Sequence, residues 1–456
     1  MRYLTIVLFF VIAAASTAAA QNSASPARLP LVQPGGASAA PAVITLQDAL
    51  ERALEFNVEV KSAIAEVKSA GEDRLQAKAS LLPSVNHTTQ YLGTQGNGTL
   101  PSGRFVSNDG VHLYRDWGVV HEDITANTIL KTESRRAEAS EALAKAKAEI
   151  AQRGLSVIVT RNYYTLVTAQ RKFATAQLGA QEASRFLELT GQQERLGEVA
   201  HFDVLKAQIQ SEQQQQEFDD ATLAMENARL NLAVLLFPSL NENFTVVDDL
   251  ESAPMLPSYD DIRKLAEREN PEIRAANHAV KQANLDIRIA RNASLPTLSL
   301  DLNYGIEANA FARHSTVAAA PEAGVLPNMG YFITANLTIP IFDWGNQKSK
   351  VRQAQLREEQ AKTRVGATER QLSADLLLNY DEAVAARAAV DRARRTMDLA
   401  TEALNVSNSR YRGGVAPASE VVESQNTVVK SRNDYADAQT RYRVAISQLQ
   451  NITGRF

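Results

Sequence analysis

Two glutamates follow a break in a long helix-forming stretch near the end of this 456-residue chain. Glu420 and Glu423 are three residues apart, so their carboxylates lie on one face of the helix that resumes after the break. Paired acids can perform acid–base chemistry, but no cleft-forming context, nucleophile elbow or phosphate loop accompanies them. From the residues alone, Glu420 is a first-turn acid stabilised by the helix dipole behind an N-cap at Ser419, and Glu423 is a solvated surface charge.

The break consists of Gly413, Gly414 and Pro417, residue types that let a long helix end and the chain turn back. A matching break stands earlier in the chain. The corresponding positions are Gly197 with Gly414, Asp203 with Glu420, and Gln208 with Gln425, all at one constant offset. A further match, at a slightly smaller offset, pairs Asn57 with Asn270 and Pro83 with Pro296. The chain is therefore an internal duplication.

Each copy is predicted to contain a helix, a pair of strands, a long helix, the break and a second long helix. The first repeat spans 44–250, with strands at about 84–93 and 111–125 and long helices at about 129–195 and 203–236. The second spans 251–456, with strands at about 297–306 and 331–341 and long helices at about 346–412 and 419–451. Apolar residues recur at alternating steps of three and four before each break, which is typical of coiled coils. The glutamine-rich segment 208–217 is predicted to be solvated helix. At about 1.5 Å per residue, the longest helices are on the order of 100 Å long.

The second-repeat strands alternate apolar and polar residues, as in "TLSLDLNYGI" and "YFITANLTIPIF". Runs of about ten residues with this period fit strands that cross a bilayer with one lipid face and one wet face. The alternative is a soluble hairpin that is half buried on another element. Four strands cannot close a barrel alone, so membrane strands predict an oligomer.

The N-terminal residues 1–20 carry the pattern of a secretory signal peptide, and residues 21–43 are predicted to be a disordered linker. No other stretch approaches 18 consecutive apolar residues, so no helix is expected to span a membrane. The chain contains no cysteine, which excludes lipidation at that residue. The net charge of −4 argues against nucleic acid as a partner. His112 and His121 lack ligand spacing, and neither a metal site nor a cofactor is predicted.

From about Ile44 to Gly454 the chain resembles the TolC family of outer-membrane efflux proteins. The resemblance is carried by the Asn-Pro of "ENPEI", the "LP" before each first strand, "LTIPIFDWG" at 337–345 and the paired breaks. It implies a mainly α fold with transmembrane β-strands, in which a homotrimer forms a 12-stranded β-barrel continued by a long periplasmic α-helical barrel. Such proteins are not enzymes but passive conduits in the bacterial outer membrane. They receive substrates from an inner-membrane transporter and a periplasmic adaptor (membrane fusion) protein, for efflux or type I secretion. The alternative is a periplasmic coiled-coil interaction protein without a pore.

The resemblance also implies roles for individual residues at matching positions. It places Glu420 and Glu423 at a pore constriction, where a trimer presents six carboxylates and favours cations. The remaining assignments are Phe202, Asp203 and Tyr411 as gate and tip contacts, Gly197, Gly413, Gly414 and Pro417 as hairpin breaks and adaptor docking positions, and Pro340 and Gly345 as the strand-to-helix corner. The basic gate residue of the family falls at Ala416, which removes an ion pair with Asp203. Arg410 and Arg412 are the candidate substitutes.

Overall fold

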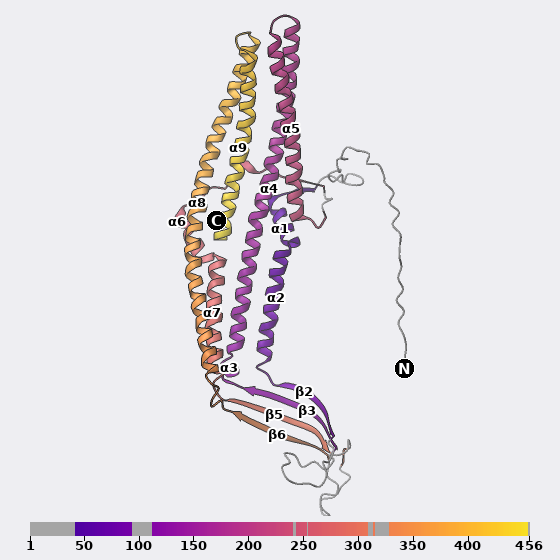
Figure 1. The fold of residues 1–456 in the computed structure, drawn as a ribbon, viewed down its shortest axis with the longest axis vertical. Helices are drawn as coiled ribbons and strands as arrows, with labels where there is room; N and C mark the ends of the chain where they lie inside the picture. The colour runs from indigo at the N-terminus through magenta and orange to yellow at the C-terminus, as the bar shows by residue number, and fades with distance from the viewer. Residues whose placement is uncertain are drawn as a thin grey trace, which may run out of the picture.

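The computed structural model describes residues 42–93, 112–239, 243–252, 254–308, 313–314 and 328–454. The molecule is elongated, with long helices along its axis and a four-stranded sheet at one end (Figure 1). The predicted signal peptide and most of the predicted linker lie outside the described residues. Two helical hairpins lie side by side, one in each predicted repeat.

The two hairpins contain the longest helices. Helix α4 (Thr132–Arg195) turns into α5 (His201–Leu236), and α8 (Asn346–Arg412) turns into α9 (Ala418–Thr453). Helix α8 packs on α9, α9 on α4, and α4 on α5, so that α5 and α8 are the outer members of the row. Among the helices of the described residues, none has the length and hydropathy required to cross a bilayer.

Shorter helix pairs precede the strands of each repeat. They are α1 (Leu46–Phe56) with α2 (Val58–Ala79), and α6 (Tyr259–Glu269) with α7 (Pro271–Asn292). The single helix predicted here is in fact split in both repeats, because Asn57 and Asn270 end one helix and cap the next. The side-chain oxygen of Asn57 accepts a hydrogen bond from the backbone of Val60, and that of Asn270 accepts bonds from two backbone N–H groups of α7.

A small belt of short elements lies beside the middle of the long helices. Strand β1 (Ala42–Ile44) pairs in parallel with β4 (Phe244–Val246), and a short 3₁₀ helix (Leu250–Ser252) follows. The prediction that the linker extends to residue 43 is therefore wrong at its end. The buried Tyr163 hydroxyl lies 2.7 Å from the carbonyl oxygen of Val247 and 3.2 Å from that of Ile44. Burial raises the pKa of Tyr163 to about 12, so its hydroxyl stays protonated as a donor to the belt.

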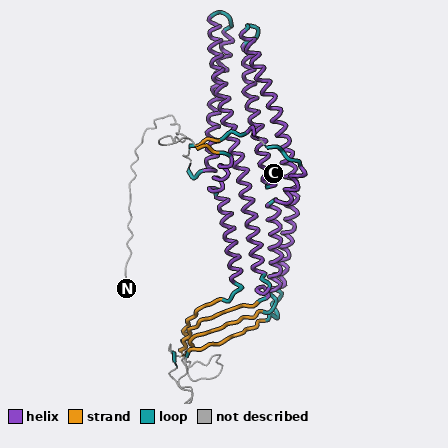
Figure 2. Tube along the Cα trace, turned by 180° about the vertical axis from the view of Figure 1, so that it is seen from behind, coloured by secondary structure: helices purple, strands orange, loops and turns teal. Residues whose placement is uncertain are grey.

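The sheet contains β2 (Ser84–Gly93), β3 (His112–Ile124), β5 (Thr297–Ala308) and β6 (Met329–Thr338), in that order and all antiparallel (Figure 2). Its register places Leu302 opposite Ile333 and Tyr304 opposite Tyr331, so the apolar residues of β5 and β6 share one face. On the same face β2 and β3 place an ion pair, His87 with Asp116 at 3.1 Å. The opposite face carries ion pairs between β3 and β5, together with the ring pair of Trp117 and Phe332. Arg115 contacts Glu307 at 3.0 Å, and His121 contacts Asp301.

The corners from strand to long helix differ between the repeats. In the second repeat β6 ends at Thr338 rather than at the predicted residue 341, because Pro340 cannot donate to the ladder. Gly345, with φ +83°, then caps α8. In the first repeat a four-residue helix, α3 (Ala126–Ile129), occupies the predicted start of the long helix, and Lys131 at φ 51° precedes α4. The predicted helix start at 129 is therefore corrected to Thr132.

Candidate functional site

Two equivalent turns form the end of the molecule farthest from the sheet. Gly197 and Gly414 adopt φ +76° and +69°, values that residues with a Cβ rarely occupy. In the first turn the backbone N–H of Glu198 donates to the carbonyl oxygen of Gln193 at 2.9 Å. In the second turn the backbone N–H of Val415 donates to the carbonyl oxygen of Arg410, also at 2.9 Å. These bonds, together with the shorter-range bonds made by the two glycines, are Schellman motifs. Ala200 and Pro417 then cap α5 and α9.

Tyr411 joins the two hairpins just before the second turn. Its side chain is 6% exposed and its ring lies 5.1 Å from that of Phe186 on α4. Its hydroxyl donates to Gln193 Oε1 at 2.8 Å and lies 3.3 Å from Thr190 Oγ1. The cluster around the two rings also includes Ala207, Ala418 and Val421. The structure thus gives Tyr411 a contact role at the tip, although its predicted role in a gate stays a prediction.

Glu420 is held by the preceding helix. Its Oε1 atom lies 3.0 Å from Arg410 Nη1 and 3.5 Å from Ser407 Oγ. The prediction that Ser419 is the N-cap is wrong, because α9 begins at Ala418 with Pro417 at the cap position. Glu420 does lie in the first turn, as expected for an acid near a helix N-terminus.

The remaining gate residues lie apart from this ion pair. Within the described part of the chain, no hydrogen bond or ion pair is formed by the side chain of Asp203. Arg410, one of the two candidate partners of Asp203, pairs with Glu420 instead. Ala416 is buried, and Phe202 is exposed beneath the Lys206 ammonium group, which lies 4.8 Å from the ring centroid. Among the described residues of a single chain, Asp203 therefore has no ion pair that could hold the two turns together.

Glu423 lies in a groove between α9 and α5. The groove has a volume of about 480 Å³ and is also lined by Lys206, Gln210 and Lys430. Glu420 and Glu423 thus share a helix face, but one carboxylate contacts α8 and the other lines the groove beside α5. Their assignment to a pore constriction stays a prediction.

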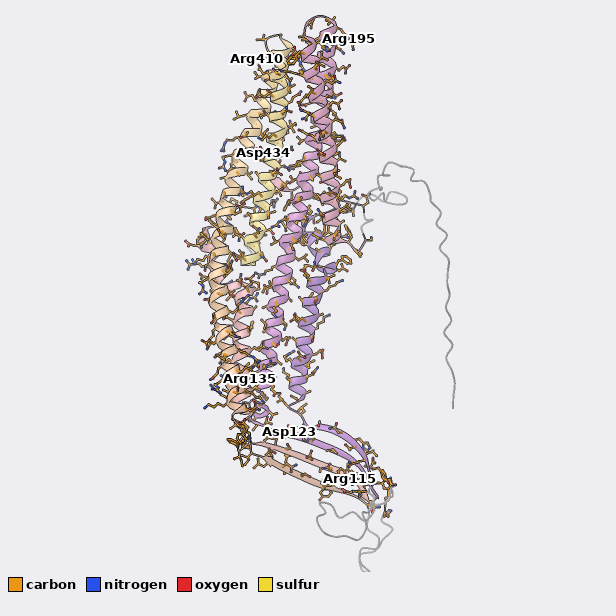
Figure 3. All side chains as sticks on the ribbon, viewed as in Figure 1. Arg115, Asp123, Arg135, Arg195, Arg410 and Asp434 are labelled. Atoms are coloured by element: carbon orange, nitrogen blue, oxygen red, sulfur yellow. The ribbon has the colours of Figure 1, made fainter. Side chains whose placement is uncertain are left out.

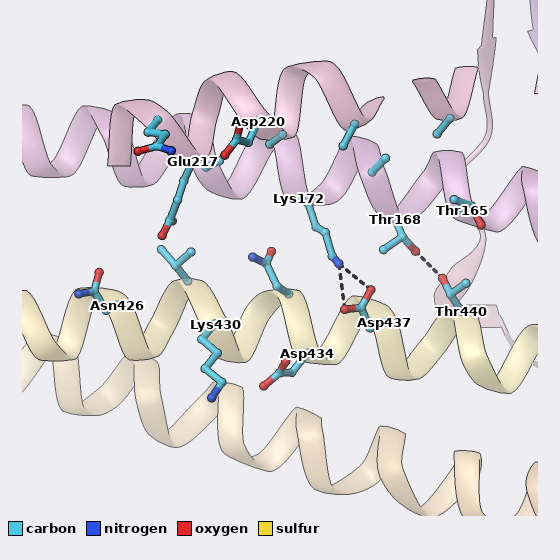
Figure 4. Close-up of a pocket in the computed structure, with 18 of the residues that line it drawn as sticks. Thr165, Thr168, Lys172, Glu217, Asp220, Asn426, Lys430, Asp434, Asp437 and Thr440 are labelled. Carbon is cyan, nitrogen blue, oxygen red and sulfur yellow. Dashed lines mark hydrogen bonds and ion pairs between the residues drawn. The ribbon is translucent and has the colours of Figure 1, made fainter. Parts of the chain in front are cut away.

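A larger groove of about 1070 Å³ continues between α5 and α9, with α4 at its side (Figure 4). Lys172 of α4 and Asp437 of α9 form an ion pair at 2.8 Å within it, and Thr168 contacts Thr440. Further acidic residues line the groove, namely Glu217, Asp220 and Asp434. Among the charged residues that line the groove, carboxylates thus outnumber lysines, and the rest of the lining is uncharged.

The prediction of a solvated helix for the glutamine-rich segment 208–217 is wrong for two of its residues. Gln210 and Gln214 are 2% and 3% exposed because they face α9. Gln210 Nε2 donates to Asn426 Oδ1 at 2.6 Å. The two glutamines are four residues apart and so share one helix face, and this spacing is the sequence pattern that could have indicated their contact with another helix. Gln193, the partner of Tyr411, had no comparable signal.

The sequence also matches a known protein family. Residues 262–455 match the family described as outer membrane efflux protein. The chain is 23% identical over 421 residues to protein CyaE of Bordetella pertussis, covering 89% of this chain and 82% of that protein. It is also 23% identical over 424 residues to outer membrane protein TolC of Escherichia coli, covering 89% and 80%.

Solved structures show the same fold. The CmeC outer membrane channel of Campylobacter jejuni aligns with a TM-score of 0.74 at 19% identity, covering 90% of this chain and 85% of that one. The outer membrane protein VceC of Vibrio cholerae aligns with a TM-score of 0.74 at 17% identity, covering 90% and 96%. At these identities the likeness concerns the fold.

Proposed function

We propose that this chain, which belongs to the outer membrane efflux protein family, is the outer-membrane channel of a tripartite efflux or type I secretion system. It is a passive conduit rather than an enzyme. Its sheet lies in the outer membrane and its helices extend into the periplasm. A periplasmic adaptor and an inner-membrane transporter deliver the exported molecule to the helical tip.

The observation that carries this proposal is the two-faced sheet. Its edge strands, β2 and β6, are unpaired on their outer sides in the described chain, and open edges are not viable in lipid. In β5 and β6 one face exposes apolar side chains, whereas the other face carries the charged pairs between β3 and β5. Three copies supply twelve strands, which close into a barrel with the apolar face toward lipid and the polar face toward the lumen.

Conductance of the purified oligomer in a planar bilayer tests the proposal. Stable single-channel steps, together with a heat-labile oligomer in the outer-membrane fraction, are expected. A protein that is confined to the soluble periplasmic fraction and carries no current would instead be a coiled-coil interaction protein without a pore.

Substitutions at two adjacent residues of β6 test which face of the sheet points toward lipid, at the same depth in the membrane. Ile333 lies on the apolar face and Thr334 on the polar face. Ile333→Lys is expected to cost about 2–4 kcal/mol in the membrane and to reduce the amount of assembled barrel. Thr334→Lys is expected to assemble normally and to alter conductance. Equal effects of both substitutions would contradict the assignment of faces.

A further inference from the structure

The outer helices of the row, α5 and α8, each have a long face that no other element of the described chain covers. Exposed residues follow both faces at alternating steps of three and four, the spacing of a coiled-coil seam. On α5 they are Phe202, Leu205, Ile209, Glu212, Gln216, Asp219 and Leu223, and on α8 they are Arg392, Arg395, Leu399, Glu402, Val406 and Ser409. A shallow groove on this face of α5 is lined by residues of α5 alone.

The two faces carry opposite charge over the same part of the helices. Four arginines of α8 are exposed between positions 387 and 395, namely Arg387, Arg392, Arg394 and Arg395. Asp391 is the acid among them. On this face of α5, Glu212 and Asp219 are exposed, as is Asp220 at its edge, which also lines the groove beside α9. The stretch from 207 to 228 contains no lysine or arginine. Over these stretches the exposed side of α5 is therefore acidic and that of α8 is basic.

The heights of these residues also correspond. The two turns lie near one end of the molecule (Figure 1), so position can be counted from Ala200, which caps α5, and from Gly413, which caps α8. Counted in this way, Asp219 and Asp220 fall between the levels of Arg395 and Arg392. At about 1.5 Å per residue, all four lie within about 5 Å of one level.

Apolar residues nearer the turns correspond in the same way. By the same count, Val406 of α8 falls between the levels of Leu205 and Ile209 of α5. Leu205 and Val406 are 43% and 52% exposed in the single chain. Packing Leu205 against Val406 removes apolar surface from water in the part of the helices between the charged residues and the turns.

We propose that the acidic face of α5 packs antiparallel against the basic face of α8 in a second copy of this chain. Asp219 and Asp220 pair there with Arg392 and Arg395, and Val406 fits between Leu205 and Ile209. Because each copy has one face of each kind, the contact is head-to-tail and generates a ring. This inference rests on the proposed oligomeric channel and names the side chains that close its helical part.

One level of the proposed seam is unfavourable. Glu402 of α8 and Glu212 of α5 lie at nearly equal distances from their turns, so two carboxylates meet. Like charges at such a position destabilise association. Glu402→Gln is therefore expected to strengthen the oligomer, a result that a purely structural role within one chain does not predict.

Disulfide trapping tests the register directly, since the natural chain has no cysteine. The double variant Leu205→Cys/Val406→Cys is expected to form covalent dimers and trimers on non-reducing gels after mild oxidation. In the control Leu205→Cys/Val384→Cys, the second thiol lies about 30 Å or more farther from the turns than the first, too far for a disulfide, so the protein is expected to stay monomeric on the same gels. Cross-linking of the control to the same extent, or none in the test pair, overturns the proposal.

Charge exchange tests the acidic and basic faces. Asp219→Arg/Asp220→Arg and Arg392→Glu/Arg395→Glu are each expected to lower the oligomer fraction about tenfold at low salt. Combining all four changes in one chain is expected to restore it. Glu182→Arg/Arg185→Glu on the exposed side of the central helix α4 serves as the control and is expected to have no effect. Failure of the fourfold variant to recover overturns the pairing.

The outcomes separate this inference from the proposed channel. A conducting trimer without the expected cross-links refutes the seam and leaves the channel standing. A protein that neither associates nor conducts refutes the channel itself. An α5 face that cross-links only to an added adaptor protein also refutes the seam.

Discussion

The hydroxyl group of Tyr411 donates a hydrogen bond to Oε1 of Gln193, 2.8 Å away, and so connects the two hairpins of one chain at their tips. The residues are 218 positions apart and belong to different repeats. Around this bond, the ring of Phe186 covers the tyrosine, and Thr190 lies within hydrogen-bonding distance of its hydroxyl. The lateral distance between the two turns is therefore fixed by side chains rather than by the backbone.

Removing this hydroxyl is expected to loosen the tip. Tyr411→Phe keeps the aromatic packing and deletes the hydrogen bond, leaving Gln193 with an unpaired acceptor, at a cost of about 1 kcal/mol. Thermal unfolding of the purified protein and its leak conductance measure the two consequences. A lower midpoint together with a larger leak is expected. An unchanged leak despite the lower midpoint would show that Tyr411 does not restrain the tip.

The glycines of the second turn are expected to differ in their tolerance of alanine. Gly414 has φ +69°, so Gly414→Ala forces a side chain into the left-handed region at a cost of about 1–2 kcal/mol. Gly413 has φ −80°, and a Cβ there meets its nearest neighbour, the carbonyl oxygen of Arg410, at 3.5 Å. Gly413→Ala is the matched control and is expected to change stability by less than about 0.5 kcal/mol. Denaturant unfolding distinguishes the two, and equal losses would contradict the turn assignment.

Removing the carboxylates of Glu420 and Glu423 is expected to reduce selectivity for cations. The double variant Glu420→Ala/Glu423→Ala removes six carboxylates from a trimeric tip, while the exposed ion pair of Glu420 with Arg410 contributes less than about 1 kcal/mol to folding. Reversal potentials and block by multivalent cations measure the effect. Glu182→Ala on α4 is the control. If the double variant keeps the selectivity and block of the natural protein, the pore assignment is wrong.

Acidification is expected to destabilise the helices around His278 on α7. Burial lowers the pKa of His278 below its usual 6.5, and Lys281 and Arg274 lower it further. A histidine whose folded pKa is depressed contributes stability that is present above the unfolded pKa and is lost as pH falls through the folded value. Melting temperature is therefore expected to fall as pH drops from about 7 to about 5, and less steeply in His278→Gln. Identical slopes for the two proteins would exclude this histidine as a cause.

The fold class was predictable because its signals are local and occur twice. Gly197 and Gly414 mark turns wherever they stand, and heptad spacing identifies long helices without knowledge of their neighbours. The alternation of β5 and β6 indicated a two-faced sheet for the same reason.

Contacts between the repeats were not predictable in this way. The bond from Tyr411 to Gln193 depends on how two hairpins lie side by side, and neither residue type indicates it. Strands β1 and β4 have three residues each, too few for a periodicity. From the sequence, Arg410 could pair with the carboxylate of either Asp203 or Glu420. The geometry of the turn places Glu420 within reach.

The belt contacts Tyr163 far from the turns, so the helices between the belt and the turns form long arms. Arg195 and Arg410 mark the free ends of the two hairpins, far from the sheet (Figure 3). From Tyr163 to Arg195 the arm is about 48 Å long, at about 1.5 Å per residue. A rotation of about 10° at the belt therefore displaces the end by about 8 Å, roughly the spacing of two packed helices. A small change of angle at the belt is thus converted into a displacement at the turns as large as the spacing between helices.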